Sequence, residues 1–127
     1  MPAPSRQRTA LEVVGALTVV SGAVQAAAPR LVLDRLAHRP DALSSHLFAT
    51  VGMFMTVSGG ALLAALRLPA AGVGGPLAWC AAQKLGSSAA VALGVKRGVL
   101  SPLSLPVAAF DLASGLLAVS YRARVKG

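Results

Sequence analysis

The sequence predicts an all-α integral membrane protein, an antiparallel four-helix bundle that forms a single membrane domain over residues 1–127. Two observations predict this class. Only 13% of the residues are charged, against about 25% in a soluble domain. The second observation is a set of four apolar stretches with at most one charged residue each: residues 11–28, 47–66, 76–95 and 103–121. Each is long enough to cross a hydrocarbon core about 30 Å thick as a helix.

The first apolar stretch has a second interpretation. Arg6 and Arg8 precede it and small residues end it, as in a secretory signal peptide. However, Glu12 interrupts its start, and the stretch exceeds the apolar core of about 7–15 residues that signal peptides have. We therefore expect a retained helix, and the other three stretches would hold the chain in the membrane under either interpretation.

The longest connection joins the first two stretches and predicts a short interfacial helix over residues 30–39. Leu33 and Leu36 lie at helical spacing beside polar residues, and Pro40 then ends the helix. Asp41 is a suitable N-cap for a helix that continues into the second stretch.

The remaining connections are short, so neighbouring helices should run antiparallel. They end in Pro76 and Pro102, which suit the first turn of a helix. Small residues recur every four positions and permit close approach of membrane helices, which predicts a tightly packed bundle. They are Thr18, Gly22 and Ala26 in the first stretch, Gly52, Thr56, Gly60 and Ala64 in the second, and Ala82, Gly86, Ala90 and Gly94 in the third.

The basic residues predict an orientation in the membrane. If four spans alternate, both termini and the 67–75 connection share one side with six basic residues, and the other side has five. The positive-inside rule then places both termini in the cytoplasm. The net charge of +8 does not indicate a nucleic-acid partner, because these residues lie at helix ends and only 4% of the chain is aromatic. Contact with membrane lipid head groups explains the charge better.

Lys84 and Asp111 are the only charged residues well inside an apolar stretch. A charge at that depth costs at least about 2.5–3.5 kcal/mol on insertion scales. Each lies about 12 Å from the side on which its helix enters, at about 1.5 Å per residue, and the two helices enter from opposite sides. We therefore expect the pair to meet near the midplane. It is either a structural ion pair or a functional acid and base, and the third possibility is that the two never meet.

Five other polar residues are candidate ligand-binding side chains around this pair: Gln83, Ser87, Ser114, Gln25 and His46. The first three lie within one helical turn of the pair. Gln25 would lie at the loop-side edge of the cluster, and His46 at the entrance to the second stretch. We expect no metal site, because the histidines are too shallow for haem ligation and the single cysteine, Cys80, excludes a cysteine-rich centre from this chain alone. The cofactor, if any, is left open.

Several features together resemble the DoxX-like small membrane proteins of bacteria. They are the four stretches, a first helix ending in Pro29-Arg30, a longer first connection, a second stretch with the run Gly52-Met-Phe-Met-Thr-Val-Ser-Gly-Gly-Ala-Leu-Leu, and a basic end to the fourth. The resemblance covers most of the chain and implies a four-helix protein of the bacterial cytoplasmic membrane. The named activity of that family is thiosulfate oxidation coupled to quinone, but no catalytic motif of the family matches residues of this chain.

Three functions follow as alternatives. The first is a quinone- or lipid-associated subunit of a membrane redox complex, whose redox centre lies in a protein partner. The second is a small membrane enzyme that acts on a lipid or isoprenoid, with Lys84 and Asp111 as catalytic acid and base. The third is a proton-coupled transporter of small molecules that works as a homo-oligomer. The expected partners are membrane lipids, a quinone or another apolar small molecule, and a membrane protein or further copies of the chain.

The topology prediction can be tested with cysteines introduced one at a time at Pro4, Arg39 and Lys126. Those at Pro4 and Lys126 should react with a membrane-impermeant thiol reagent only after lysis, whereas that at Arg39 should react in intact cells. If the cysteines at positions 4 and 39 react from the same side of the membrane, the first predicted span does not cross it and the four-span topology is wrong.

Overall fold

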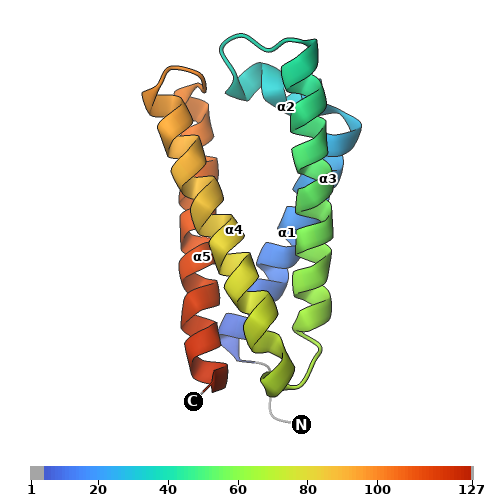
Figure 1. Cartoon of the computed structure of the whole chain (residues 1–127), viewed down its shortest axis with the longest axis vertical. Coiled ribbons are helices and arrows are strands. Elements are labelled where there is room, and N and C mark those ends of the chain that lie inside the picture. The colour runs from blue at the N-terminus through green and yellow to red at the C-terminus, as the bar shows by residue number, and fades with distance from the viewer. Residues whose placement is uncertain (1–4, 127) are drawn as a thin grey trace.

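The computed structural model describes residues 5–126 and is all-helical over them, which confirms the all-α part of the prediction. Pro4, a labelling position in the topology test, lies outside the described residues. The elements in chain order are α1 (Arg6–Ala27), α2 (Pro29–Leu36), α3 (Ala42–Ala65), α4 (Ala70–Lys96), a 3-10 turn η1 (Pro102–Ser104) and α5 (Leu105–Lys126) (Figure 1).

The four long helices form two hairpins. α1 packs along α3 and α4 packs along α5, whereas contacts between the two pairs are far fewer. Figure 1 shows the pairs close together at the end that carries both termini and apart at the other end. The structure is therefore more open than the tightly packed bundle that the small residues predicted.

A hydrophobic core joins the two hairpins at the end near the termini. Its buried residues come from all four long helices: Leu11, Leu62, Ala65, Leu66, Val73, Leu77, Ala81 and Ala118. Hydrogen bonds support the same end, since Gln7 Nε2 donates to Ser120 Oγ at 2.9 Å and Arg122 Nε donates to the Gly74 carbonyl at 2.9 Å. The hairpins are thus joined by side-chain packing at this end, and backbone hydrogen bonds between the end of α2 and the α4–α5 connection join them at the other.

The contact between α1 and α3 depends on glycines. A Cβ atom placed on Gly52 would lie 2.6 Å from the backbone nitrogen of Ala26 and 2.7 Å from the Gly22 carbonyl oxygen. Neither distance is possible for real atoms, so no larger residue fits there without moving the helices apart. The predicted packing role of these glycines is confirmed.

The predicted packing role of Gly60 and Gly86 is wrong. A Cβ atom on either would meet nothing within 4 Å, so neither glycine lies at a helix contact. In the second hairpin the close approach occurs instead at Gly115 of α5, where a Cβ atom would lie 2.7 Å from Leu85 Cγ of α4. Spacing alone identified small residues without showing which of them face another helix.

The helix ends follow their local sequence. Asp41 caps α3 as predicted: its Oδ1 accepts from the Ser44 backbone N–H at 2.7 Å, and Ser44 Oγ accepts from the Asp41 N–H at 2.8 Å. The hydrogen bond from the Ser44 backbone lowers the pKa of Asp41. The C-terminal end of α4 forms a Schellman motif, in which Gly98 adopts φ 72° and Val99 N–H donates to the Gly94 carbonyl at 3.0 Å.

Two predicted boundaries are wrong. α4 begins at Ala70, so Pro76 lies inside the helix and not in its first turn. Because its nitrogen is part of the ring, Pro76 has no backbone N–H to donate to the carbonyl four residues earlier. The helix tolerates the loss of this one hydrogen bond near its beginning. α2 ends at Leu36, before residue 39, because the next residues pair with the α4–α5 connection: Ala37 bridges to Leu100, and His38 N–H donates to the Val99 carbonyl at 3.3 Å.

Within residues 5–126, three helical segments are long and apolar enough to cross a membrane: α1, α3 and the continuous segment Pro102–Lys126. This agrees with the membrane class predicted from the composition. α4 is also long, but polar side chains in its middle lower its mean hydropathy, among them Gln83 and Lys84. Length and composition therefore identify three spans where the sequence analysis predicted four.

The two glycine environments on α3 predict opposite effects of the same substitution. Gly52→Ala should destabilise the protein by about 1–3 kcal/mol, because the added methyl group overpacks the α1–α3 contact. Gly60→Ala should be neutral or stabilise by up to about 1 kcal/mol, because alanine favours a helix and meets no neighbour. Thermal unfolding in detergent measures both, and equal midpoints for the two variants would contradict the packing described here.

Candidate functional site

Lys84 and Asp111 meet in the interface between α4 and α5, as the sequence predicted. Lys84 Nζ lies 3.0 Å from Asp111 Oδ1, and their side chains are only 3% and 8% exposed. An isolated charge in such a place would be costly, whereas an ion pair with good geometry compensates for much of its own desolvation. The pair therefore keeps two charges buried between α4 and α5.

Serines of α4 complete the polar cluster. Ser87 Oγ lies 2.6 Å from Asp111 Oδ2, to which it donates, so both carboxylate oxygens have a partner. Ser88 Oγ donates to the Ala108 carbonyl at 2.8 Å and ties the same two helices together. Ser88 was not among the candidate residues, although its position one turn after Lys84 was a usable signal.

Local packing brings the pair within hydrogen-bonding distance. Gly115 lies one turn after Asp111, and its contact with Leu85, the residue after Lys84, lets the two helices approach closely. The ring of Phe110 adds a second contact, since its centroid lies 5.3 Å from Lys84 Nζ. A cation over an aromatic face at this distance is attracted by the ring quadrupole.

A cavity of about 620 Å³ lies between α3 and α4 and reaches Lys84. Gln83, Cys80 and Trp79 line it from α4, Ser58 from α3 and Thr18 from α1. Lys84 is its one charged lining residue, and Asp111 is not part of the lining. A molecule in this cavity would therefore lie against Lys84 and not against Asp111.

The other candidate residues lie in different surroundings. Ser114 is buried on α5 one turn from Asp111, and Gln83 is half-buried at the cavity. Gln25 does not join the cluster, because its Nε2 donates to the Phe48 carbonyl at 2.9 Å across the α1–α3 contact. His46 is exposed near the start of α3. The structure thus places Gln83, Ser87 and Ser114 near the pair, but not Gln25 or His46.

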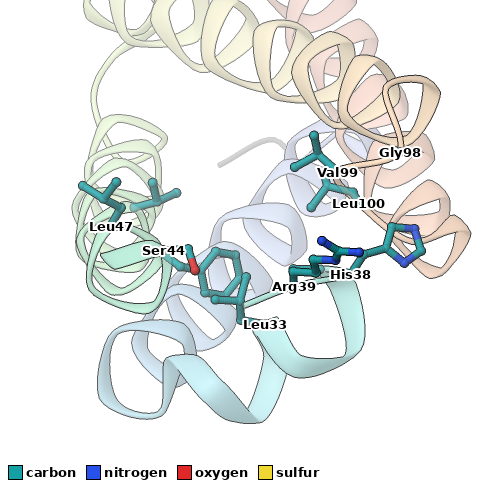
Figure 2. Close-up of a pocket in the computed structure, with 11 residues that line it drawn as sticks. Leu33, His38, Arg39, Ser44, Leu47, Gly98, Val99 and Leu100 are labelled. Carbon is teal, nitrogen blue, oxygen red and sulfur yellow. The ribbon is translucent and has the colours of Figure 1, made fainter. Parts of the chain in front are cut away.

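A second cavity, of about 1020 Å³, lies at the end opposite the termini. Figure 2 shows Ser44 and Leu47 of α3 on one side of it and Val99 and Leu100 of the α4–α5 connection on the other. Leu33 of α2 and the two residues His38 and Arg39 also line it, together with Ala37, Phe48, Val51 and Gly98. Most of its walls are therefore apolar, with basic side chains from one segment.

The chain matches no known protein family, no curated protein and no solved structure. The resemblance to DoxX-like proteins accordingly stays a prediction. Within residues 5–126, no group of three or more His, Cys, Asp or Glu side chains is arranged to hold a metal ion.

The burial of the pair predicts strong coupling between its two members. Lys84→Met leaves a carboxylate without its cation, and Asp111→Leu leaves an ammonium without its anion. Each should lower the free energy of unfolding by about 3–5 kcal/mol. The double variant should lose much less than the sum, because apolar replacements of a buried pair are well tolerated.

Thermal unfolding in detergent across the four proteins measures this coupling. Lys96→Met is the matched control, since Lys96 is exposed at the end of the same helix and its loss should cost less than about 1 kcal/mol. Additive losses in the double variant would show that the two side chains do not interact.

Proposed function

We propose that α4 crosses the membrane together with α1, α3 and α5, so that the chain is a four-span protein of the bacterial cytoplasmic membrane. α4 has 27 residues, which at about 1.5 Å per residue exceeds the hydrocarbon thickness. The polar residues in the middle of α4 are compatible with a membrane-spanning position. Lys84 and Ser88 are buried against α5, and each has a hydrogen-bond partner there. Charged residues inside membrane proteins occur in such paired, inward-facing positions.

The function that the geometry supports best is the binding of an apolar small molecule that carries a hydrogen-bond acceptor, with quinones as the chemical class. One observation carries this proposal: a mostly apolar cavity between two membrane helices has a single charged lining residue, Lys84. Ligand pockets typically combine apolar walls with a few polar groups that fix orientation, in volumes of about 300–1,000 Å³. The cavity of about 620 Å³ lies within that range.

Lys84 is suited to contact a carbonyl oxygen. An ammonium group has three donors, and Asp111 takes one of them at 3.0 Å. Asp111, which itself accepts a hydrogen bond from Ser87 Oγ, holds the lysine side chain in place against α5. Gln83 offers an amide group on the same wall, and Trp79 an aromatic ring at the rim. A quinone has two carbonyl acceptors on a ring that would pack against such walls.

In this proposal the chain is a quinone- or lipid-associated subunit of a membrane redox complex. The resemblance to DoxX-like proteins supports the quinone class. The electron-carrying centre would belong to a protein partner, since the described residues form no metal-binding cluster. Catalysis by Lys84 and Asp111 together on a lipid is less well supported, because only Lys84 lines the cavity.

The arrangement of the hairpins favours proton-coupled transport as a second candidate. α1 with α3 and α4 with α5 form separate packed pairs with a cavity between them. Two such bodies can rock against each other around a central site, as in transporters with alternating access. Proton-coupled uptake into vesicles that hold the purified protein would support this candidate over the first.

Quinone binding can be measured through Trp79, because it is the only tryptophan of the chain and lines the cavity. Titration of the protein in detergent with decylubiquinone should quench its fluorescence to saturation. The variant Lys84→Met/Asp111→Leu should lose about tenfold or more in affinity, as expected for removal of a hydrogen bond to a charged group.

Lys96→Met serves as the control and should bind as the natural protein does. Equal saturable quenching in the double variant and the control would contradict a role of Lys84. Quenching that rises without saturation in all proteins would show that the cavity takes no quinone.

A further inference from the structure

The cavity at the end opposite the termini has the properties of a separate binding site. Both hairpins contribute to it: α2 and α3 from the first, and the α4–α5 connection from the second. Its volume of about 1020 Å³ is at the upper end of the range for small-molecule pockets. It shares no lining residue with the cavity at Lys84.

Hydrogen bonds fix its walls relative to each other. Ser101 N–H donates to the Leu36 carbonyl at 2.7 Å, and Ser101 Oγ donates to the Arg35 carbonyl at 2.9 Å. These bonds connect the end of α2 to the α4–α5 connection, together with the bridge between Ala37 and Leu100. The cavity is therefore formed without a ligand, which reduces the cost of ordering on binding.

Charge gives the cavity a polar end. Arg39 is in its lining, and within residues 5–126 its guanidinium makes no ion pair with a carboxylate. The two acidic residues nearby have other contacts, since Asp34 pairs with Arg30 at 3.3 Å and Asp41 caps α3. His38 lies beside Arg39 in the lining. The cavity thus presents an unpaired cation and an imidazole.

Apolar side chains continue from this polar end along α3. Leu47, Phe48 and Val51 line the cavity on that helix and face Val99 and Leu100 across it. A ligand that matches both parts needs an anionic head group and a hydrocarbon chain. A guanidinium binds carboxylate or phosphate oxygens through two parallel hydrogen bonds.

We propose that this cavity binds an anionic amphiphile, with its carboxylate or phosphate head group at Arg39 and His38 and its hydrocarbon chain along α3. The predicted interfacial position of α2 fits such a ligand, because a lipid in the bilayer has its head group at that level. The site is distinct from the quinone cavity, and its existence does not depend on Lys84.

Binding of dodecyl phosphate and of dodecanoate to the purified full chain in dodecyl maltoside tests the proposal, with native mass spectrometry to count bound molecules. The neutral alcohol dodecanol has the same chain and serves as the uncharged reference. Arg39→Gln should weaken binding of the anion by about tenfold or more and leave dodecanol unaffected.

Arg35→Gln is the matched control. Arg35 is an exposed residue of α2 that carries the same charge at the same end of the molecule but does not line the cavity. It should change anion binding by less than twofold. Tighter binding of dodecyl phosphate would identify a phosphate head group as the preferred ligand, and tighter binding of dodecanoate a carboxylate.

Two results would overturn the proposal. Equal losses in Arg39→Gln and Arg35→Gln would show attraction by the net charge of this end only, and equal binding of anion and dodecanol would show that the charge plays no part. The variant Lys84→Met/Asp111→Leu separates this proposal from the previous one, because it should lose decylubiquinone binding and keep dodecyl phosphate binding.

Discussion

The buried charges of Lys84 and Asp111 impose the main constraint on how α4 and α5 pack, because neither can be buried without the other. Each charge would be costly in an apolar helix by itself, and each is stable here because the other lies 3.0 Å away. With both charges present, α4 and α5 must align at a relative height that brings the two side chains together. Ser87 and Ser88 strengthen the same alignment.

The two hairpins solve the packing problem in different ways. Between α1 and α3, small residues such as Gly22 and Gly52 bring the backbones close together, and dispersion contacts dominate. Between α4 and α5, the polar cluster adds hydrogen bonds to one close approach at Gly115. Because the strong contacts lie within each hairpin, the space between the hairpins is left for the two cavities.

The sequence predicted the helices and the buried pair well, because both follow from one-dimensional quantities. Apolar stretches mark the helices, and the depth of Lys84 and Asp111 in stretches that run in opposite directions predicts that they meet. The division into hairpins was not predictable in this way, since the spacing of Gly60 and Gly86 resembles that of Gly52 although both face open space. The placement of Gln25 in the polar cluster was wrong for the same reason. Its side-chain amide donates a hydrogen bond to the Phe48 carbonyl of α3, and spacing does not indicate which helix a side chain faces.

Solid-state NMR of the protein in lipid bilayers tests the central claim most directly. With 15N in the lysine side chains and 13C in the aspartate carboxyl groups, there are only three labelled residues of each type. The structure predicts a strong dipolar coupling between one lysine Nζ and one aspartate carboxyl carbon, assigned to Lys84 and Asp111, and none for the exposed Lys96. Absence of any such coupling in the bilayer would contradict a buried ion pair and the arrangement of α4 and α5 that depends on it.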